Sequence, residues 1–138
     1  SFGTARRTIL GLDQNRVSLL VAVMEKKIGM HLLGDDIFMN VAGGVKIDEP
    51  AVDLGLVTAV ASSFLLKAIP DSTLVLGDVG LTGEVRGIGQ VETRIAEARK
   101  MGFTHCLLPQ SNYKRLENDG GIAITGIRNI AEGIETLF

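Results

Sequence analysis

Two groups of residues in this 138-residue chain have types and spacing that could support catalysis. Ser63 and Lys67 lie four positions apart, so on a helix they would share a face, as in a serine–lysine dyad. Asp48, Glu49 and Asp53 form an acidic cluster that could act in general acid–base chemistry. Both groups also have ordinary explanations, because lysine suits a helix C-terminus and carboxylates suit a helix N-terminus. The structural explanation is preferred for both, and Asp53, on an otherwise apolar helix, is expected to need a buried partner.

Metal and nucleotide sites are not indicated by the sequence. His31 and His105 are far apart along the chain, and the one cysteine, Cys106, forms no Cys-x-x-Cys pair. The glycine-rich stretch 77–89 matches neither the phosphate loop nor the dinucleotide fingerprint, so its glycines are assigned to turns. A single cysteine excludes an internal disulfide and suits a reducing cytosol.

The charge of the chain limits how it could bind a polyanion. The net charge is −2, so nucleic-acid binding would have to come from a local patch rather than from bulk charge. Most of the 14 lysines and arginines are interpreted as solvated charges. Lys46 and Arg86 are distinguished by position, because Lys46 follows two glycines before an apolar helix and Arg86 lies beside a turn.

The apolar pattern predicts a central helix from about Glu49 to Lys67 that is hydrophobic on nearly every side and therefore buried. This helix is too short and too interrupted for a membrane span, and no signal peptide is visible. Asp13 is expected to cap the N-terminus of a second helix, and Gly29 to end it. With only six aromatic residues, the core must be aliphatic.

The remaining elements follow from periodicity and turn residues. We expect strands at 6–12, 37–42, 73–78, 104–108 and 121–125, a hairpin at 79–86, and helices at 14–28, 90–101, 111–117 and 127–138. We expect Ser111 and Asn112 to cap the helix at 111–117. The alternation of helices and strands indicates one α/β (α+β) domain over residues 1–138, with a mixed, largely parallel sheet packed with helices.

Two separated motifs resemble the proteolytic domain of Lon proteases: residues 43–54, Gly-Gly-Val-Lys-Ile-Asp-Glu-Pro-Ala-Val-Asp-Leu, and residues 80–89, Gly-Leu-Thr-Gly-Glu-Val-Arg-Gly-Ile-Gly. In that family the central helix starts Gly-Pro-Ser-Ala-Gly with the nucleophilic serine, and a later Ile-Gly-Gly-Leu-Lys-Glu-Lys run carries the activating lysine. The corresponding positions here are Ala51 and Glu92. The resemblance therefore implies the Lon-type fold, which is similar to ribosomal protein S5 domain 2, with vestigial rather than working catalytic positions.

A closer resemblance covers essentially the whole chain and is to the C-terminal Lon-like domain of bacterial RadA-type (Sms) DNA-repair proteins. It rests on matches in order at residues 6–8, 11–16, 19–29, 41–50, 62–64 and 79–86. Full chains of that family add a zinc finger and a RecA-like ATPase, so a full-length DNA-dependent ATPase with ATP, Mg and Zn is expected, and no cofactor in this domain. The resemblance also implies that this is a fragment and that the domain's first strand begins before Ser1.

The resemblance further implies a role in recombinational repair in the bacterial cytoplasm, as part of a hexameric ring acting on single-stranded or branched DNA. The Lon-like domain would supply a ring-forming scaffold, beside its own RecA-like ATPase domain, and a surface that contacts DNA. The expected DNA contacts are Lys46 and Arg86, beside the vestigial catalytic site, followed by Arg94, Arg6 and Arg16. Their expected target is backbone phosphate, which gives sequence-tolerant, salt-dependent binding.

Two alternatives stay open at this point. One is an active peptidase with a displaced dyad such as Ser63 and Lys67. The other is an oligomerisation domain without DNA contact, in which the basic residues pair between subunits.

Overall fold

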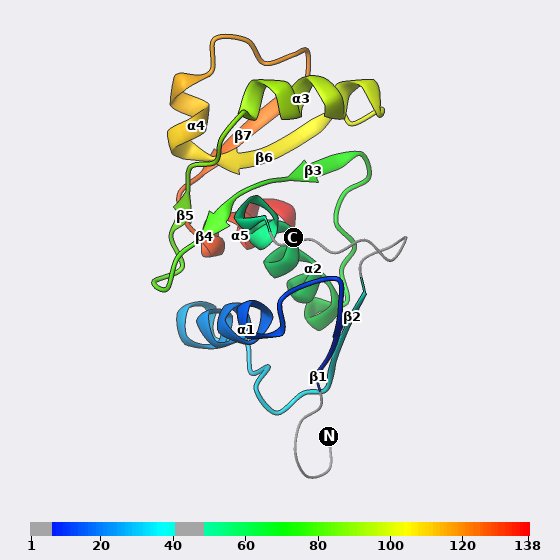
Figure 1. Cartoon of the computed structure of the whole chain (residues 1–138), viewed down its shortest axis with the longest axis vertical. Helices are drawn as coiled ribbons and strands as arrows, with labels where there is room; N and C mark the ends of the chain where they lie inside the picture. The colour runs from blue at the N-terminus through cyan, green and yellow to red at the C-terminus, as the bar shows by residue number, and fades with distance from the viewer. Residues whose placement is uncertain (1–6, 41–48) are drawn as a thin grey trace. The chain divides into compact units, whose positions relative to one another are not determined.

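A computed structural model describes residues 7–40 and 49–138 of the chain (Figure 1). These residues form two compact units that divide between Glu49 and Pro50. Helices alternate with strands through both, which confirms the mixed α/β class. In this part of the chain, no helix is long and apolar enough to cross a membrane.

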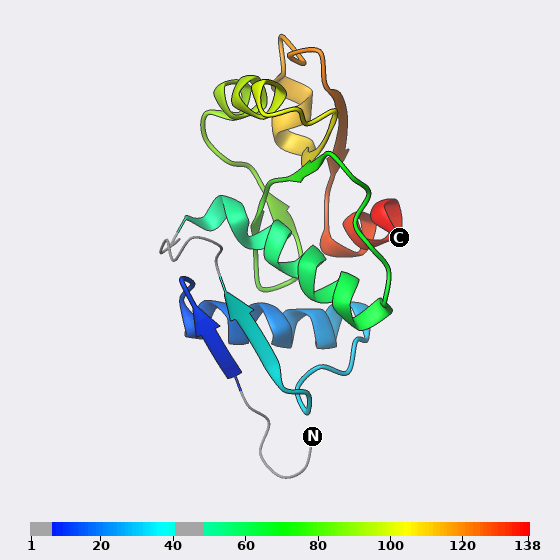
Figure 2. The same ribbon diagram turned by 90° about the vertical axis from the view of Figure 1, so that its right-hand side faces the viewer.

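The first unit contains β1 (Arg7–Leu10), α1 (Gln14–Ile28) and β2 (Ile37–Asn40). The two strands pair in parallel, with Arg7 opposite Ile37, and α1 lies across one face of the pair (Figure 2). The predicted boundaries of α1 are confirmed. The Asp13 carboxylate accepts hydrogen bonds from the backbone N–H groups of Asn15 and Arg16, and Gly29 ends the helix with φ 69°.

The second unit contains the remaining elements: η2 (Pro50–Val52), α2 (Asp53–Leu65), β3 (Thr73–Val75), β4 (Asp78–Val79), β5 (Val85–Arg86), α3 (Val91–Lys100), β6 (His105–Pro109), α4 (Gln110–Arg115), β7 (Ala123–Ile127) and α5 (Ile130–Leu137). Strands β3, β6 and β7 form a parallel sheet in the order β3-β6-β7. Strands β4 and β5 form the expected antiparallel hairpin. Helices α3 and α4 lie on one side of the parallel sheet, and α2 and α5 lie on the other (Figures 1 and 2).

The core of the second unit is aliphatic, as expected. Helix α3 buries Ile95 and Ala98 against the sheet residues Cys106 and Leu108. On the other side, α5 approaches α2 closely at Gly133, where an added Cβ would lie 3.0 Å from the Ile127 side chain and 3.7 Å from Leu54. Within the second unit, no aromatic side chain is among the fully buried ones.

The predicted boundaries of three helices are wrong, each for a local reason. The central helix begins with the 3₁₀ turn η2 and ends at Leu65, because Leu66 adopts the left-handed conformation with φ 55°. Helix α4 begins at Gln110, directly after Pro109, without a side-chain cap. Helix α5 begins at Ile130 rather than 127, because the Asn129 side chain caps it through the Glu132 N–H at 2.9 Å.

Candidate nucleic-acid interface

Ala51, which the motif resemblance predicts at the position of a Lon nucleophile, lies in η2 and is only 3% exposed. Its carbonyl accepts a hydrogen bond from Gly77 N at 2.9 Å, and Leu54 N donates to Gly77 O at 3.0 Å. Gly77 permits this approach, because an added Cβ would lie 2.9 Å from Val85 Cγ1 and 3.3 Å from Leu54. These two hydrogen bonds join the start of the central helix to the segment that leads into β4. The side chain of Ala51, at this junction, is a methyl group.

Asp53, two residues further on, has the buried partner that the sequence led us to expect. Its carboxylate is 2% exposed and accepts a hydrogen bond from Val79 N at 3.0 Å. A buried charge is stabilised when backbone N–H groups donate to it, so Asp53 holds β4 against α2. Glu49 is exposed, and Asp48 lies outside the described residues, so the grouping of the three acids stays a prediction.

Glu92, which the motif resemblance predicts at the position of the activating lysine, lies in the first turn of α3 and is exposed. Its Oε1 accepts a hydrogen bond from Glu117 N at 3.2 Å, so this carboxylate holds the chain after α4.

The Ser63–Lys67 pair does not share a helical face, because α2 ends at Leu65 and Lys67 lies beyond the left-handed residue Leu66. The backbone N–H of Lys67 donates instead to Ser62 O at 3.1 Å. The spacing that suggested a dyad is therefore not realised as helical geometry.

Arg86, the leading DNA-contact candidate in the second unit, lies on β5 with its side chain 56% exposed. Its guanidinium lies 3.3 Å from Glu84 Oε2. The hydroxyl of Thr82 donates to Glu84 Oε1 at 2.9 Å, and this hydrogen bond is the main cause of the lowered pKa of Glu84. Arg86 is thus accessible, but an ionised carboxylate offsets part of its charge.

The other predicted contacts are dispersed. The Arg94 Nε donates to Gly89 O at 2.9 Å and so holds the loop before α3. Arg16 lies in the first turn of α1, in the other unit. Lys46 and Arg6 lie outside the described residues.

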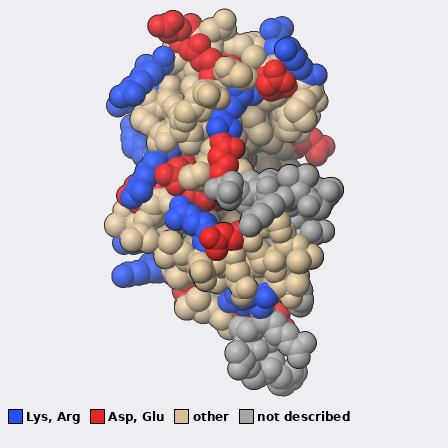
Figure 3. Space-filling model, viewed as in Figure 1, with Lys and Arg blue, Asp and Glu red and all other residues tan. Residues whose placement is uncertain are grey.

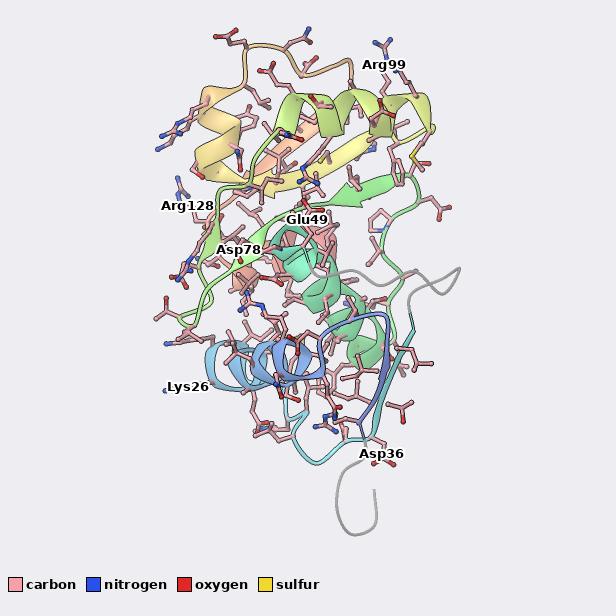
Figure 4. All side chains as sticks on the ribbon, in the orientation of Figure 1. Lys26, Asp36, Glu49, Asp78, Arg99 and Arg128 are labelled. Carbon is pink, nitrogen blue, oxygen red and sulfur yellow. The ribbon has the colours of Figure 1, made fainter. Side chains whose placement is uncertain are left out.

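A groove in the second unit brings together basic residues that sequence reasoning missed. It has a volume of about 360 Å³ and is lined by Val85, Gln110, Ser111, Lys114, Arg115 and Arg128, which we call the α4 groove. Figure 4 shows Arg128 beside the base of α4, and Figure 3 shows lysine and arginine side chains gathered along the edge that carries α4 and β5. Lys114 and Arg115 sit in the last turn of α4, where cations are ordinary, so their sequence positions carried no signal.

Metal and thiol chemistry find no support among residues 7–40 and 49–138. No group of three histidine, cysteine or acidic side chains there could hold a metal ion. Cys106 is buried on β6, and burial raises the pKa of its thiol to about 12, so this sulfur stays protonated and unreactive near neutral pH.

Comparison with known proteins relates this chain to one protein family and to a set of DNA-repair proteins. Residues 20–127 match the family described as the Lon protease (S16) C-terminal proteolytic domain. The chain is 46% identical over 136 residues to the DNA repair protein RadA of Bacillus subtilis (strain 168), covering 99% of this chain and 30% of that protein.

Two other RadA proteins show a similar relation. Identity is 43% to that of Streptococcus pyogenes serotype M3, across 99% of this chain and 30% of the relative. Identity to the RadA protein of Listeria monocytogenes serovar 1/2a is 40%, across 97% of this chain and 29% of that protein. The chain thus spans less than a third of the length of these relatives. It belongs to the family of Lon protease C-terminal proteolytic domains and matches the C-terminal Lon-like domain of RadA DNA-repair proteins.

Proposed function

We propose that this chain is a proteolytically inactive Lon-like domain of a bacterial, cytoplasmic RadA-type repair protein. The observation that carries the proposal is the 46% identity across 99% of the chain to a protein named for DNA repair. In the full-length protein, a DNA-dependent ATPase of this type would process branched recombination intermediates. The domain itself would provide the scaffold for a ring, expected to be a hexamer, and a sequence-independent contact to DNA.

The proposed loss of peptidase activity has a chemical basis. A serine–lysine peptidase needs a hydroxyl as nucleophile and a neutral amine as base. A methyl group at Ala51 cannot attack a carbonyl, and Glu92 is an acid whose carboxylate already accepts the Glu117 N–H. These two substitutions support a scaffold role for the helix start that a Lon protease would use for catalysis.

The proposed DNA contact uses phosphate-binding cations rather than base-reading groups. Lys46 and Arg86 stay the proposed contacts beside the vestigial site, with Arg94, Arg6 and Arg16 as further candidates. The exposed side chain of Arg86 supports its place in this set. Contacts of this kind position a protein on DNA without reading its sequence.

The experiment that separates this function from a peptidase is incubation of the chain with unfolded casein and with a serine-reactive fluorophosphonate probe. We expect intact casein and no covalent label, with an active serine peptidase as the positive control. Labelling of Ser63, abolished in a Ser63→Ala variant and retained in Ser62→Ala, would overturn the proposal. It would show that a displaced nucleophile works.

A further inference from the structure

We propose that the α4 groove binds consecutive phosphate groups of a nucleic-acid backbone through Lys114, Arg115 and Arg128. The inference rests on the proposed function, in which the domain contacts DNA, and it adds a second phosphate-binding surface to the contacts proposed at Lys46 and Arg86.

The lining of the α4 groove is unbalanced in charge. Three of its six residues are cations and none is acidic. In the part of the chain that the structure describes, neither Lys114 nor Arg115 forms an ion pair. Arg128 lies 3.7 Å from Glu132, but the two side chains are 71% and 35% exposed, so this pair is weak and can open for a stronger anion. The groove therefore presents uncompensated positive charge.

One wall of the groove is fixed by hydrogen bonds from α4. The Asn112 side chain accepts from Ile88 N and donates to Ile88 O, both at 2.9 Å, and so joins α4 to the segment after β5. Gly87 permits this approach, since an added Cβ would lie 3.0 Å from Ser111 Oγ. The cations of α4 are therefore mounted on a backbone that is tied at two points to its neighbour.

The opposite wall is fixed in the same manner. Val85 N donates to Arg128 O at 2.8 Å, which ties the base of the Arg128 side chain to β5. Gly126 lets α4 lie directly on β7, because an added Cβ would overlap Gln110 and lie 2.8 Å from Tyr113 Cβ. A preorganised arrangement of donors loses less conformational entropy when a ligand binds, so this construction favours a binding surface.

The chemistry of the donors suits phosphodiester oxygens. Arginine can bind two such oxygens at once, and lysine binds them as a point charge. Gln110 and Ser111 add neutral donors of the kind that commonly contact the nucleic-acid backbone. The groove, about 360 Å³ in volume, is lined from β5, α4 and the residue after β7, so its cations come from two segments of the chain and can contact separate phosphates.

The neighbour of the groove on β5 explains why Arg86 is not part of it. Successive side chains of a strand point to opposite faces, and Val85 lines the groove, so Arg86 is directed to the other face. Arg86 also pairs with Glu84, whereas neither Lys114 nor Arg115 pairs with a carboxylate among the residues that the structure describes. The α4 groove is therefore expected to contribute more to phosphate binding than Arg86.

The test is an NMR titration of the ¹⁵N-labelled chain with a short oligothymidylate, which detects weak binding residue by residue. Inorganic tripolyphosphate serves as a second probe. The variant Lys114→Gln/Arg115→Gln removes two charges from the last turn of α4. Its matched control, Lys26→Gln/Lys27→Gln, removes two charges from the last turn of α1.

We expect the oligonucleotide to shift the amide signals of Val85, Arg128 and the groove residues of α4. For single-stranded DNA, each phosphate contact adds about 0.7 to the slope of log K against log salt concentration. The groove variant loses two such contacts, so its slope should be smaller by about 1.4. This change corresponds to about a 25-fold loss of affinity near 0.1 M salt. The control variant should bind within about twofold of the parent chain.

Three other results would contradict the inference in different ways. If the oligonucleotide binds elsewhere and the groove variant binds normally, the groove assignment fails while the proposed DNA contact stands. If the oligonucleotide binds nowhere on the chain, both fail. Binding of tripolyphosphate without the oligonucleotide would also overturn the inference, since the groove would then hold a small anion only.

Discussion

At the scale of single residues, the buried carboxylate of Asp53 joins α2 to β4, a partner that the charge pattern alone did not identify. It accepts the Val79 N–H at 3.0 Å with 2% of the residue exposed. Asp53→Ala should destabilise the chain by about 1–3 kcal/mol, because a buried backbone donor loses its acceptor. Urea denaturation measures the change. Asp53→Asn, which keeps an acceptor oxygen, is the matched control and should cost clearly less. Equal stability of the parent and the alanine variant would contradict this role.

Cys106 gives a second prediction at the residue scale. Burial raises its pKa from 9.0 to about 12, so the folded chain should react with a thiol reagent such as DTNB far more slowly at pH 7–8 than the urea-unfolded chain. Since the native state keeps this proton longer than the unfolded state, the stabilising contribution is present below pH 9 and is lost as the pH rises from about 9 to about 12. Rapid stoichiometric labelling of the native chain would contradict the buried position.

The basic residues show what sequence reasoning could not reach at this scale. Lys114 and Arg115 have an ordinary explanation as cations at a helix C-terminus, and Arg128 follows well after them in the chain. Only the parallel pairing of β6 with β7 brings α4 beside the residue that follows β7. Their grouping is a consequence of topology, which short-range patterns do not contain.

At the scale of elements, local signals decided which boundaries were predictable. Helix α1 was placed correctly because Asp13 and Gly29 have clear capping chemistry. The end of α2 was missed because leucine is not a helix-stop residue. Leu66 nevertheless adopts φ 55°, and the Leu66 and Lys67 N–H groups donate to the carbonyls of Ser63 and Ser62. The helix C-terminus is therefore set by backbone hydrogen bonds whose position the side chains do not reveal.

Asn112 gives the prediction at this scale, because its side chain makes a tertiary contact that the local sequence does not reveal. It was expected to cap α4, but its amide binds both backbone groups of Ile88. Asn112→Ala should destabilise the chain by about 1–3 kcal/mol, from two lost hydrogen bonds. Thermal or urea denaturation gives the magnitude.

The matched control for this variant is Asn15→Ala, an exposed position on α1, where the change should stay within about 0.5 kcal/mol. If both alanine variants were equally stable, Asn112 would not be joining α4 to the segment after β5.

At the scale of the whole molecule, two separated motifs were enough to indicate the Lon-type family, which the match over residues 20–127 confirms. The same motifs predict the vestigial catalytic positions Ala51 and Glu92, and the loss of the nucleophile stays a prediction. The grouping of cations in the α4 groove was not readable from the sequence, since a net charge of −2 conceals any local excess of cations. The proposed ring would bring several weak contacts together and so raise the overall affinity through avidity.

The most direct test of the central claim, a domain that binds DNA without reading its sequence, is fluorescence anisotropy of two unrelated labelled DNA strands titrated with the chain at several salt concentrations. We predict equal affinities for the two strands and a linear fall of log K with log salt concentration. The variant Lys46→Gln/Arg86→Gln should show a smaller slope. Absence of binding at low salt, or an affinity that depends on sequence and not on salt, would contradict the account.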